Sequence, residues 1–252
     1  MAISPLLTGH PVSLAVLDYG LFKVHSNGRI IGICGYLIGT SAGEYVLIDS
    51  GFPRKYAHDF AAASTEDRLY EFGEVLVCGP DNLPEAQLAR CGVEPDAIDL
   101  VIQTHTHIDH IGGIADFMQA PMLIAAAERA LPRPLYWGGV QPLEWPDRHY
   151  VILDEDCDIG PGFSVMLAPG HAPGQLAMML DLPQTGAVLL TSDAISRPAE
   201  IDEKFAGSMD EAAACDSADR LMQRAAADNA FVIYGHDPQQ WDRLRKAPLI
   251  YD

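Results

Sequence analysis

The sequence predicts an α/β (α+β) fold in which helices cover β-sheets, and three observations support this. Short runs rich in Val, Ile and Leu recur along the chain and are bounded by Gly, Pro and Asp, as strands are. Helix signals lie between some of these runs without strict alternation, which indicates a layered arrangement. The chain has 252 residues, 48% of them hydrophobic, so it can bury a full core. We expect residues 1–252 to form a single domain.

The apolar runs give the order of the expected strands. Residues 131–147, which contain four prolines and two tryptophans, interrupt this series and predict an ordered loop. Strands are expected at residues 12–17, 30–38, 45–48, 100–103, 122–125, 165–168, 176–180, 188–191 and 231–234.

Helices are expected in three of the segments between strands. Proline in a first helical turn and glycine just beyond a last turn are typical of helix ends. A serine three residues before a glutamate has the spacing of a capping box. The expected helices are a partly helical stretch within residues 53–72, one between Asn82-Pro84 and Gly92, and the longest, from Ser208 and Glu211 to about Asp228.

The composition limits the kinds of molecule that this protein is expected to bind and the compartment in which it is expected to occur. The formal charge of -19, from 35 acidic and 16 basic residues, would repel a nucleic acid, so none is expected as a partner. The longest apolar run, residues 30–39, is too short to span a bilayer. The first residues carry Pro5 and Pro11 and no Lys or Arg, which does not resemble a secretory signal. Five cysteines without a CxxC pair fit reduced thiols, so we expect a cytoplasmic protein with no membrane partner.

The densest chemical signal follows the expected strand at residues 100–103. His105 and His107 would project from the same face of an extended strand end, because side chains alternate with a period of two, and could share one ion. Asp109 and His110 come after the expected strand end and could turn towards a second position nearby. Imidazoles and carboxylates without a thiolate suit zinc, and also iron, manganese or cobalt.

The HxHxDH pattern followed by glycines resembles the signature of the metallo-β-lactamase superfamily. This resemblance implies a four-layer αββα sandwich of two mixed β-sheets flanked by helices. Four more segments resemble motifs of that superfamily in the expected order: Leu-Ile-Asp-Ser-Gly at residues 47–51, Pro-Gly-His-Ala-Pro-Gly at 169–174, Ser-Asp-Ala at 192–194 and Tyr-Gly-His-Asp at 234–237.

The resemblance also implies the ligands of two divalent metal ions, zinc foremost. Carried over residue by residue, it places one ion on His105, His107 and His171. It places the other on Asp109, His110 and His236, with Asp193 bridging the two ions. For Asp49 two interpretations stay open: an outer acceptor that orients a ligand histidine, or a plain turn aspartate.

Within the superfamily, the segments around His171, Asp193 and His236 are most similar to those of N-acyl homoserine lactone lactonases. This resemblance implies a homodimeric, quorum-quenching hydrolase that opens a lactone ring by attack of a metal-bridging hydroxide, with Asp109 as general acid and base. One position departs from the pattern. Ser196 stands where those enzymes commonly carry a tyrosine that hydrogen-bonds the substrate, so either another donor replaces it or the substrate differs.

Two alternatives to a lactonase remain open on the sequence alone. A thioester hydrolase of the glyoxalase II type, or another ester or amide hydrolase, would use the same metal motif, but little chain follows His236 to form the C-terminal arm of a glyoxalase II. A non-catalytic metal-binding protein would be favoured if ligands were missing, whereas all seven positions are filled.

Overall fold

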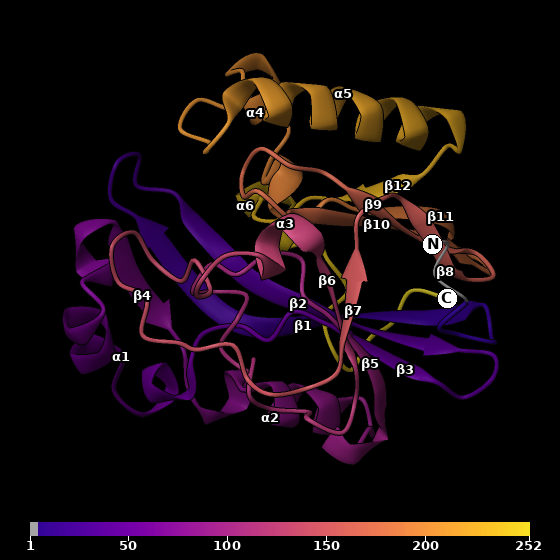
Figure 1. The fold of residues 1–252 in the computed structure, drawn as a ribbon, viewed down its shortest axis with the longest axis horizontal. Coiled ribbons are helices and arrows are strands. Elements are labelled where there is room, and N and C mark those ends of the chain that lie inside the picture. The colour runs from indigo at the N-terminus through magenta and orange to yellow at the C-terminus, as the bar shows by residue number, and fades with distance from the viewer. Residues whose placement is uncertain (1–4) are drawn as a thin grey trace.

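Two β-sheets lie face to face between outer helices in the computed structural model, which describes residues 5–252 (Figure 1). Residues 1–4, part of the stretch in which no secretory signal is expected, lie outside the described residues. The first sheet has the strand order β4-β1-β2-β3-β5-β6-β7 and the second β12-β11-β10-β9-β8. Both are mixed: β3, β5, β6 and β7 run parallel to one another beside the antiparallel β1, β2 and β4, and β12 pairs in parallel with β11 in the otherwise antiparallel second sheet.

The strands of the first sheet are β1 (Pro11–Val24), β2 (Ile30–Thr40), β3 (Tyr45–Ile48), β4 (Gly73–Val77), β5 (Ile98–Ile102), β6 (Met122–Ala125) and β7 (Tyr150–Leu153). Those of the second are β8 (Cys157–Gly160), β9 (Phe163–Leu167), β10 (Leu176–Leu182), β11 (Gly186–Leu190) and β12 (Phe231–Ile233). The helices are α1 (Arg54–Glu66), α2 (Pro84–Arg90), α3 (Ala126–Arg129), α4 (Ala199–Asp202), α5 (Glu211–Ala227) and α6 (Pro238–Trp241).

Alternation along the strands divides the core into layers. In β3, Val46 and Ile48 belong to the cluster between the two sheets, while Leu47 belongs to the cluster on the outer face of the first sheet. The outer cluster of the second sheet packs Leu189 against Leu221 of α5. Successive side chains of a strand point to opposite faces, so one short apolar run serves two cores. The predicted four-layer sandwich is therefore confirmed.

The strands that the sequence did not predict are β4, β7 and β8, and each lies at an edge of its sheet. An edge strand is partly exposed, and the burial of these three alternates irregularly between buried and exposed residues. Strand β8 contains no apolar run, whereas β4 contains Val75–Val77 and β7 consists of Tyr150–Leu153, which are short apolar runs of the kind that predicted the other strands. Strand β1 is longer than expected because a bulge between Asp18 and Gly20 carries the pairing past a polar interruption.

The helix starts also differ from expectation in detail. The prediction that Ser208 caps the long helix is wrong: Asp210 is the N-cap, and its side chain accepts a hydrogen bond from the Ala213 amide. A carboxylate in this place satisfies a free amide and complements the helix dipole. This helix, α5, is the longest among residues 5–252, as expected. Helix α2 begins with Pro84 in its first turn, and the interior of residues 131–147 has no helix or ladder strand.

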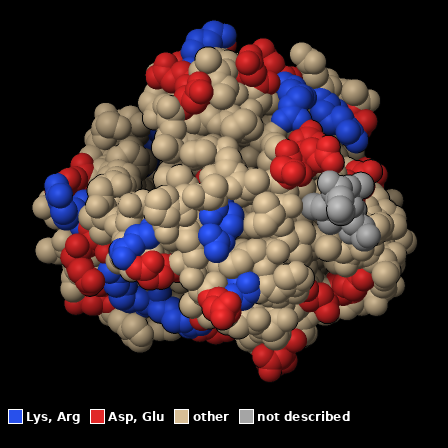
Figure 2. All heavy atoms as spheres, in the orientation of Figure 1, with Lys and Arg blue, Asp and Glu red and all other residues tan. Residues whose placement is uncertain are grey.

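The surface carries both signs of charge. Figure 2 shows acidic and basic side chains interspersed over one face of the molecule. In the described part of the chain, no helix combines the length and the apolar character that crossing a membrane requires.

Candidate metal centre

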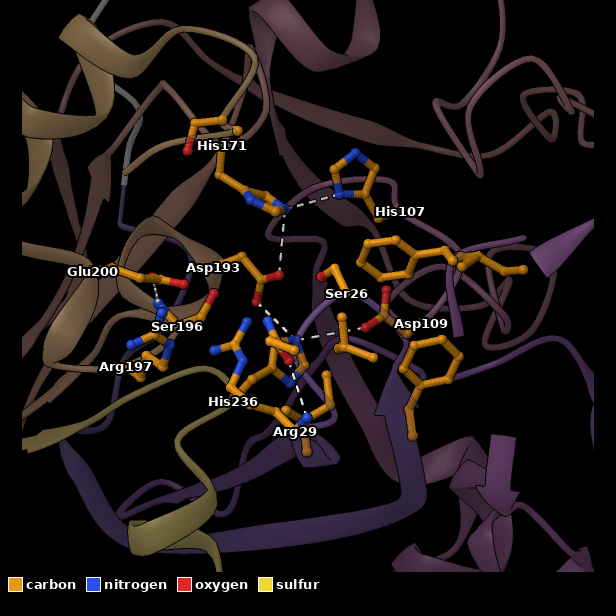
Figure 3. Close-up of a pocket in the computed structure, with 18 of the residues that line it drawn as sticks. Ser26, Arg29, His107, Asp109, His171, Asp193, Ser196, Arg197, Glu200 and His236 are labelled. Atoms are coloured by element: carbon orange, nitrogen blue, oxygen red, sulfur yellow. Dashed lines mark hydrogen bonds and ion pairs between the residues drawn. The ribbon is translucent and has the colours of Figure 1, made fainter. Parts of the chain in front are cut away.

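The ligand candidates lie in segments that follow strand ends. The HxHxDH segment follows β5, His171 lies between β9 and β10, Asp193 lies in a single 3₁₀ turn after β11, and His236 follows β12. These ends meet at one edge of the sandwich, where the first sheet contributes the HxHxDH segment and the second contributes the other three residues. Figure 3 shows five of the seven side chains, His107, Asp109, His171, Asp193 and His236, pointing into the same pocket.

Three imidazoles form the first group. His107 Nδ1 lies 3.1 Å from His105 Nε2 and 2.9 Å from His171 Nε2. All three ligand atoms lie within 4.8 Å of one another. The geometry matches three nitrogens that converge on one point.

The second group contains one carboxylate and two imidazoles. Asp109 Oδ2 lies 3.5 Å from His236 Nε2 and 3.6 Å from His110 Nε2. These three residues also offer ligand atoms that all lie within 4.8 Å of one another.

Asp193 lies between the two groups, with one carboxylate oxygen towards each. Its Oδ2 is 3.3 Å from His171 Nε2 and 3.9 Å from His105 Nε2. Its Oδ1 is 3.1 Å from His236 Nε2 and 3.4 Å from His110 Nε2. A carboxylate with one oxygen on each side has the geometry of a bridge between two ions.

Unsatisfied polar atoms support a cation here. Within residues 5–252, His110 Nε2, His236 Nε2 and Asp193 Oδ1 are buried without a hydrogen-bond partner. Buried polar atoms without partners are costly and rare. All three belong to groups that bind divalent cations. The residues present therefore fit a pair of divalent metal ions.

Asp49 forms a hydrogen bond with His110 of the second group, at the ring nitrogen that does not face the centre. His110 Nδ1 donates to Asp49 Oδ2 at 2.8 Å, which leaves Nε2 free to face the centre. Thr104 donates to the same carboxylate through its amide and its hydroxyl, at 2.9 and 2.7 Å. Asp49 has a left-handed backbone with φ of 59°, which is strained for a non-glycine residue and typical of functional positions. These contacts favour the outer-acceptor interpretation over the plain turn.

Two more imidazoles are held by a hydrogen bond at their second ring nitrogen. His236 Nδ1 donates to the Gly32 carbonyl at 2.8 Å. His105 Nδ1 lies 3.1 Å from the Thr104 hydroxyl. Each contact occupies the nitrogen that points away from the centre, as is usual for metal-binding histidines.

Burial and charge divide the histidines into two electrostatic classes. Burial lowers the pKa of His105, His107 and His171, and neighbouring imidazoles lower it further for His105 and His107; that of His107 falls to about 3. Burial also disfavours a charge on His236, but Asp193 and Asp109 outweigh it and raise its pKa to about 9. The pKa of His110 is raised against burial by Asp109, Asp193 and Asp49. The histidines of the first group therefore stay neutral, whereas protons would compete with a metal ion for the histidines of the second group.

A residue that the sequence analysis missed connects two ligand segments. The fully buried Glu128 of α3 accepts hydrogen bonds from the amide and hydroxyl of Thr106, at 2.8 and 2.5 Å, and from the Gly174 amide at 3.1 Å. It thereby ties the HxHxDH segment to the loop that carries His171. A lone glutamate in an ordinary helix gives no sequence signal for this role.

The centre opens into a cavity of about 580 Å³. Aromatic side chains, among them Phe22, Phe52 and Trp137, line it together with polar residues. Tyr36 and Tyr136 are buried in the core. Ser196 does line the cavity, but its short side chain makes no hydrogen bond within the described residues; its amide donates to Glu200 Oε2 at 2.7 Å.

Comparisons with known proteins agree with this geometry. Residues 35–247 match the model of the metallo-β-lactamase superfamily. An N-acyl homoserine lactonase from Bacillus thuringiensis is 29% identical over 219 residues, 84% of each chain. N-acyl homoserine lactonase AttM from Azorhizobium caulinodans is 30% identical over 183 residues, 66% of this chain and 68% of the relative.

Solved structures show the same fold. A quorum-quenching N-acyl homoserine lactone lactonase aligns with a TM-score of 0.81 at 23% identity and covers 97% of this chain and 100% of its own. AidC, a dizinc quorum-quenching lactonase, aligns with a TM-score of 0.62 at 17% identity, over 93% of this chain and 92% of its own. With the matched residues 35–247 and the sandwich described above, the chain belongs to the metallo-β-lactamase superfamily and is a metal-dependent hydrolase.

Proposed function

We propose that this chain hydrolyses lactones, with N-acyl homoserine lactones as the first candidates, and that its seven His and Asp side chains hold two divalent metal ions. The observation that carries the proposal is Asp193, whose two oxygens face two separate ligand groups. The similarity to curated N-acyl homoserine lactonases over 84% of the chain supports the substrate class.

Two divalent ions in this place would supply Lewis acidity and lower the pKa of water from 15.7 to about 7. The chain's own residues would hold and position them: His105, His107 and His171 on one side, Asp109, His110 and His236 on the other, with Asp193 shared between the sides. The buried acceptors beside His105, His110 and His236 hold a proton on the nitrogen that faces away from the centre, so the nitrogen that faces the centre is the one that would bind a metal ion.

Asp109 is the candidate for proton transfer. Its carboxylate lines the cavity and is 18% exposed, whereas Asp193 is 7% exposed. It can therefore reach substrate as well as the centre. We assign it the transfer of a proton from the attacking water to the alkoxide that leaves when the ring opens. The ring-opened product is a hydroxy acid, so water is the other reactant and no further co-reactant is needed.

The test combines elemental analysis with a hydrolysis panel. The purified protein is expected to contain two divalent ions per chain and to open N-hexanoyl homoserine lactone faster than it cleaves lactoylglutathione or a chromogenic β-lactam. Preference for the thioester would replace this proposal with a glyoxalase II type activity. A protein that binds metal and hydrolyses nothing would favour a non-catalytic role.

A further inference from the structure

Arg29 is a cation of the cavity that the proposed reaction does not use. It lies in the turn before β2, where its amide donates to Asn27 Oδ1 at 3.0 Å and its carbonyl accepts from the Val24 amide at 2.9 Å. The backbone position is thus fixed by the hairpin. Figure 3 shows its side chain in the pocket, on the same side as His236 and Ser196.

The guanidinium of Arg29 has unsatisfied donors. Its Nε and Nη1 are buried without a hydrogen-bond partner among residues 5–252, and no carboxylate of that range forms an ion pair with it. Leaving charged donors buried and unpaired costs more than leaving neutral ones. The same feature marks His110, Asp193 and His236, where a ligand is expected. A ligand atom that accepts hydrogen bonds would remove this cost.

The neighbouring carboxylates already have partners. Glu203 pairs with Arg197, and Glu200 accepts the Ser196 amide at 2.7 Å. Arg197 also keeps a buried Nε without a partner. Burial, and then the charge of Arg197, lower the pKa of Arg29. Two guanidiniums with free donors therefore lie on one side of the cavity.

We propose that Arg29, with Arg197 beside it, binds an oxygen acceptor on a substituent of the substrate, so that the pocket selects lactones with an amide carbonyl or a carboxylate next to the ring. This inference rests on the proposed lactone hydrolysis. The two guanidiniums also provide hydrogen-bond donors in a pocket where Ser196 is short, because Arg29, Arg197 and Ser196 line the same cavity.

The acceptor belongs to a substituent rather than to the ester that reacts. The charges that act most strongly on Arg29 are those of Arg197, Glu200 and Glu203, and not the carboxylates of the metal centre. Figure 3 shows Arg29 on the side of the pocket where Arg197 and Glu200 lie, with Asp109 on the other side. A substrate whose ester lies at the centre would extend its substituent towards Arg29.

The experiment compares lactones of one ring size and similar shape. N-acetyl homoserine lactone carries an amide oxygen; 2-(2-methylpropyl)-γ-butyrolactone replaces that group by an alkyl group of similar size; 2-carboxymethyl-γ-butyrolactone carries a carboxylate. The kcat/KM of each is measured for the metal-loaded wild type, for Arg29→Met and Arg29→Lys, and for Arg90→Met. Arg90 is an exposed arginine at the end of α2 that does not line the cavity.

Wild type is expected to favour both oxygen-bearing lactones over the alkyl lactone. Arg29→Met should reduce that preference by about 10- to 100-fold, the range for a hydrogen bond to a charged group, while Arg29→Lys retains part of it and Arg90→Met all of it. Metal content should be the same in the four proteins. Equal losses on all three lactones in Arg29→Met, or a wild type without preference, would overturn the inference. Absence of hydrolysis of any lactone by the wild type would instead refute the proposed function.

Discussion

Replacing Asp49 by asparagine tests how the protein presents a metal ligand. The carboxylate accepts four hydrogen bonds: from His110 Nδ1, from the amide and hydroxyl of Thr104, and from Gln103 Nε2. The Thr104 amide and Gln103 Nε2 both donate to Oδ1, so the oxygen of an asparagine must take that place. Its NH₂ group then faces His110 Nδ1, which can accept only in the other tautomer. The proton moves to Nε2, the atom that faces the metal centre.

The magnitude follows from these contacts. Asp49→Asn removes the charge-assisted hydrogen bond to His110, and loss of such an outer partner typically lowers metal affinity by about 10- to 100-fold. That corresponds to roughly 1.4 to 2.8 kcal/mol of binding free energy. The loss should fall on the ion held by Asp109, His110 and His236. The group of His105, His107 and His171 does not contact Asp49 and should keep its ion.

The assay is competition for zinc against a chromophoric chelator, with metal per chain measured by elemental analysis. At limiting zinc the variant is expected to hold close to one ion where the wild type holds two. Asp67→Asn is the matched control, because Asp67 is equally buried and accepts from Tyr56 and Tyr136 but touches no ligand histidine. If Asp49→Asn bound both ions with wild-type affinity, the tautomer argument would be refuted.

Three further substitutions test other parts of the structure. Asp109→Asn should lower kcat by about 100-fold or more while metal content falls much less; a loss of activity only in proportion to metal would contradict its role in proton transfer. Gly235→Ala should destabilise the fold by about 1 to 3 kcal/mol and reduce metal content, because a Cβ there would lie 2.8 Å from Asp193 Oδ1. Urea unfolding measures the stability and elemental analysis the metal content. A variant with full metal content would argue against this prediction. Glu44→Gln should cost about 1 to 2 kcal/mol at pH 7. Hydrogen bonds from Thr40, Thr8 and Gly9 outweigh burial and lower the pKa of Glu44 to about 2, so its stabilisation is present above the unfolded value and lost as pH falls towards 2. Urea unfolding at pH 7 and pH 3 should show the difference shrinking at the lower pH, and a constant difference would contradict the assignment.

A continuous apolar run predicted most of the strands, although the run of β7, Tyr150–Leu153, was missed. Central strands such as β3 and β5 are buried on both faces, so their residues are mostly apolar, with the exposed Asp99 of β5 as the exception, and both were found at nearly the expected positions. The edge strand β8 buries only some of its residues, and its sequence lacks that signal. The N-cap of α5 was misplaced because Ser208 and Asp210 both have side chains that can cap a helix, and only the backbone conformation decides between them.

The candidate ligands could be predicted because each belongs to a short motif, whereas their supports could not. Glu128 hydrogen-bonds Thr106 and Gly174, which lie 22 and 46 residues away along the chain. Arg29 has no motif, and its unpaired donors become evident only once the cavity is formed. Sequence spacing thus indicates which atoms can bind a metal, while burial and hydrogen bonds decide which side chains hold those atoms in place.

Thr104 shows how the two sheets are kept in register at the metal centre. Its hydroxyl donates to Asp49 in the first sheet's loop region and accepts from the Ser192 hydroxyl at 3.0 Å, one residue before Asp193. Its carbonyl accepts from the Leu176 amide at the start of β10, at 2.9 Å. One residue therefore contacts the outer acceptor of His110, the neighbour of the bridging aspartate and a strand of the second sheet. Because these bonds are buried, a shift between the sheets would leave several polar groups unsatisfied at once, which explains how ligands from two halves of the chain can keep a fixed spacing.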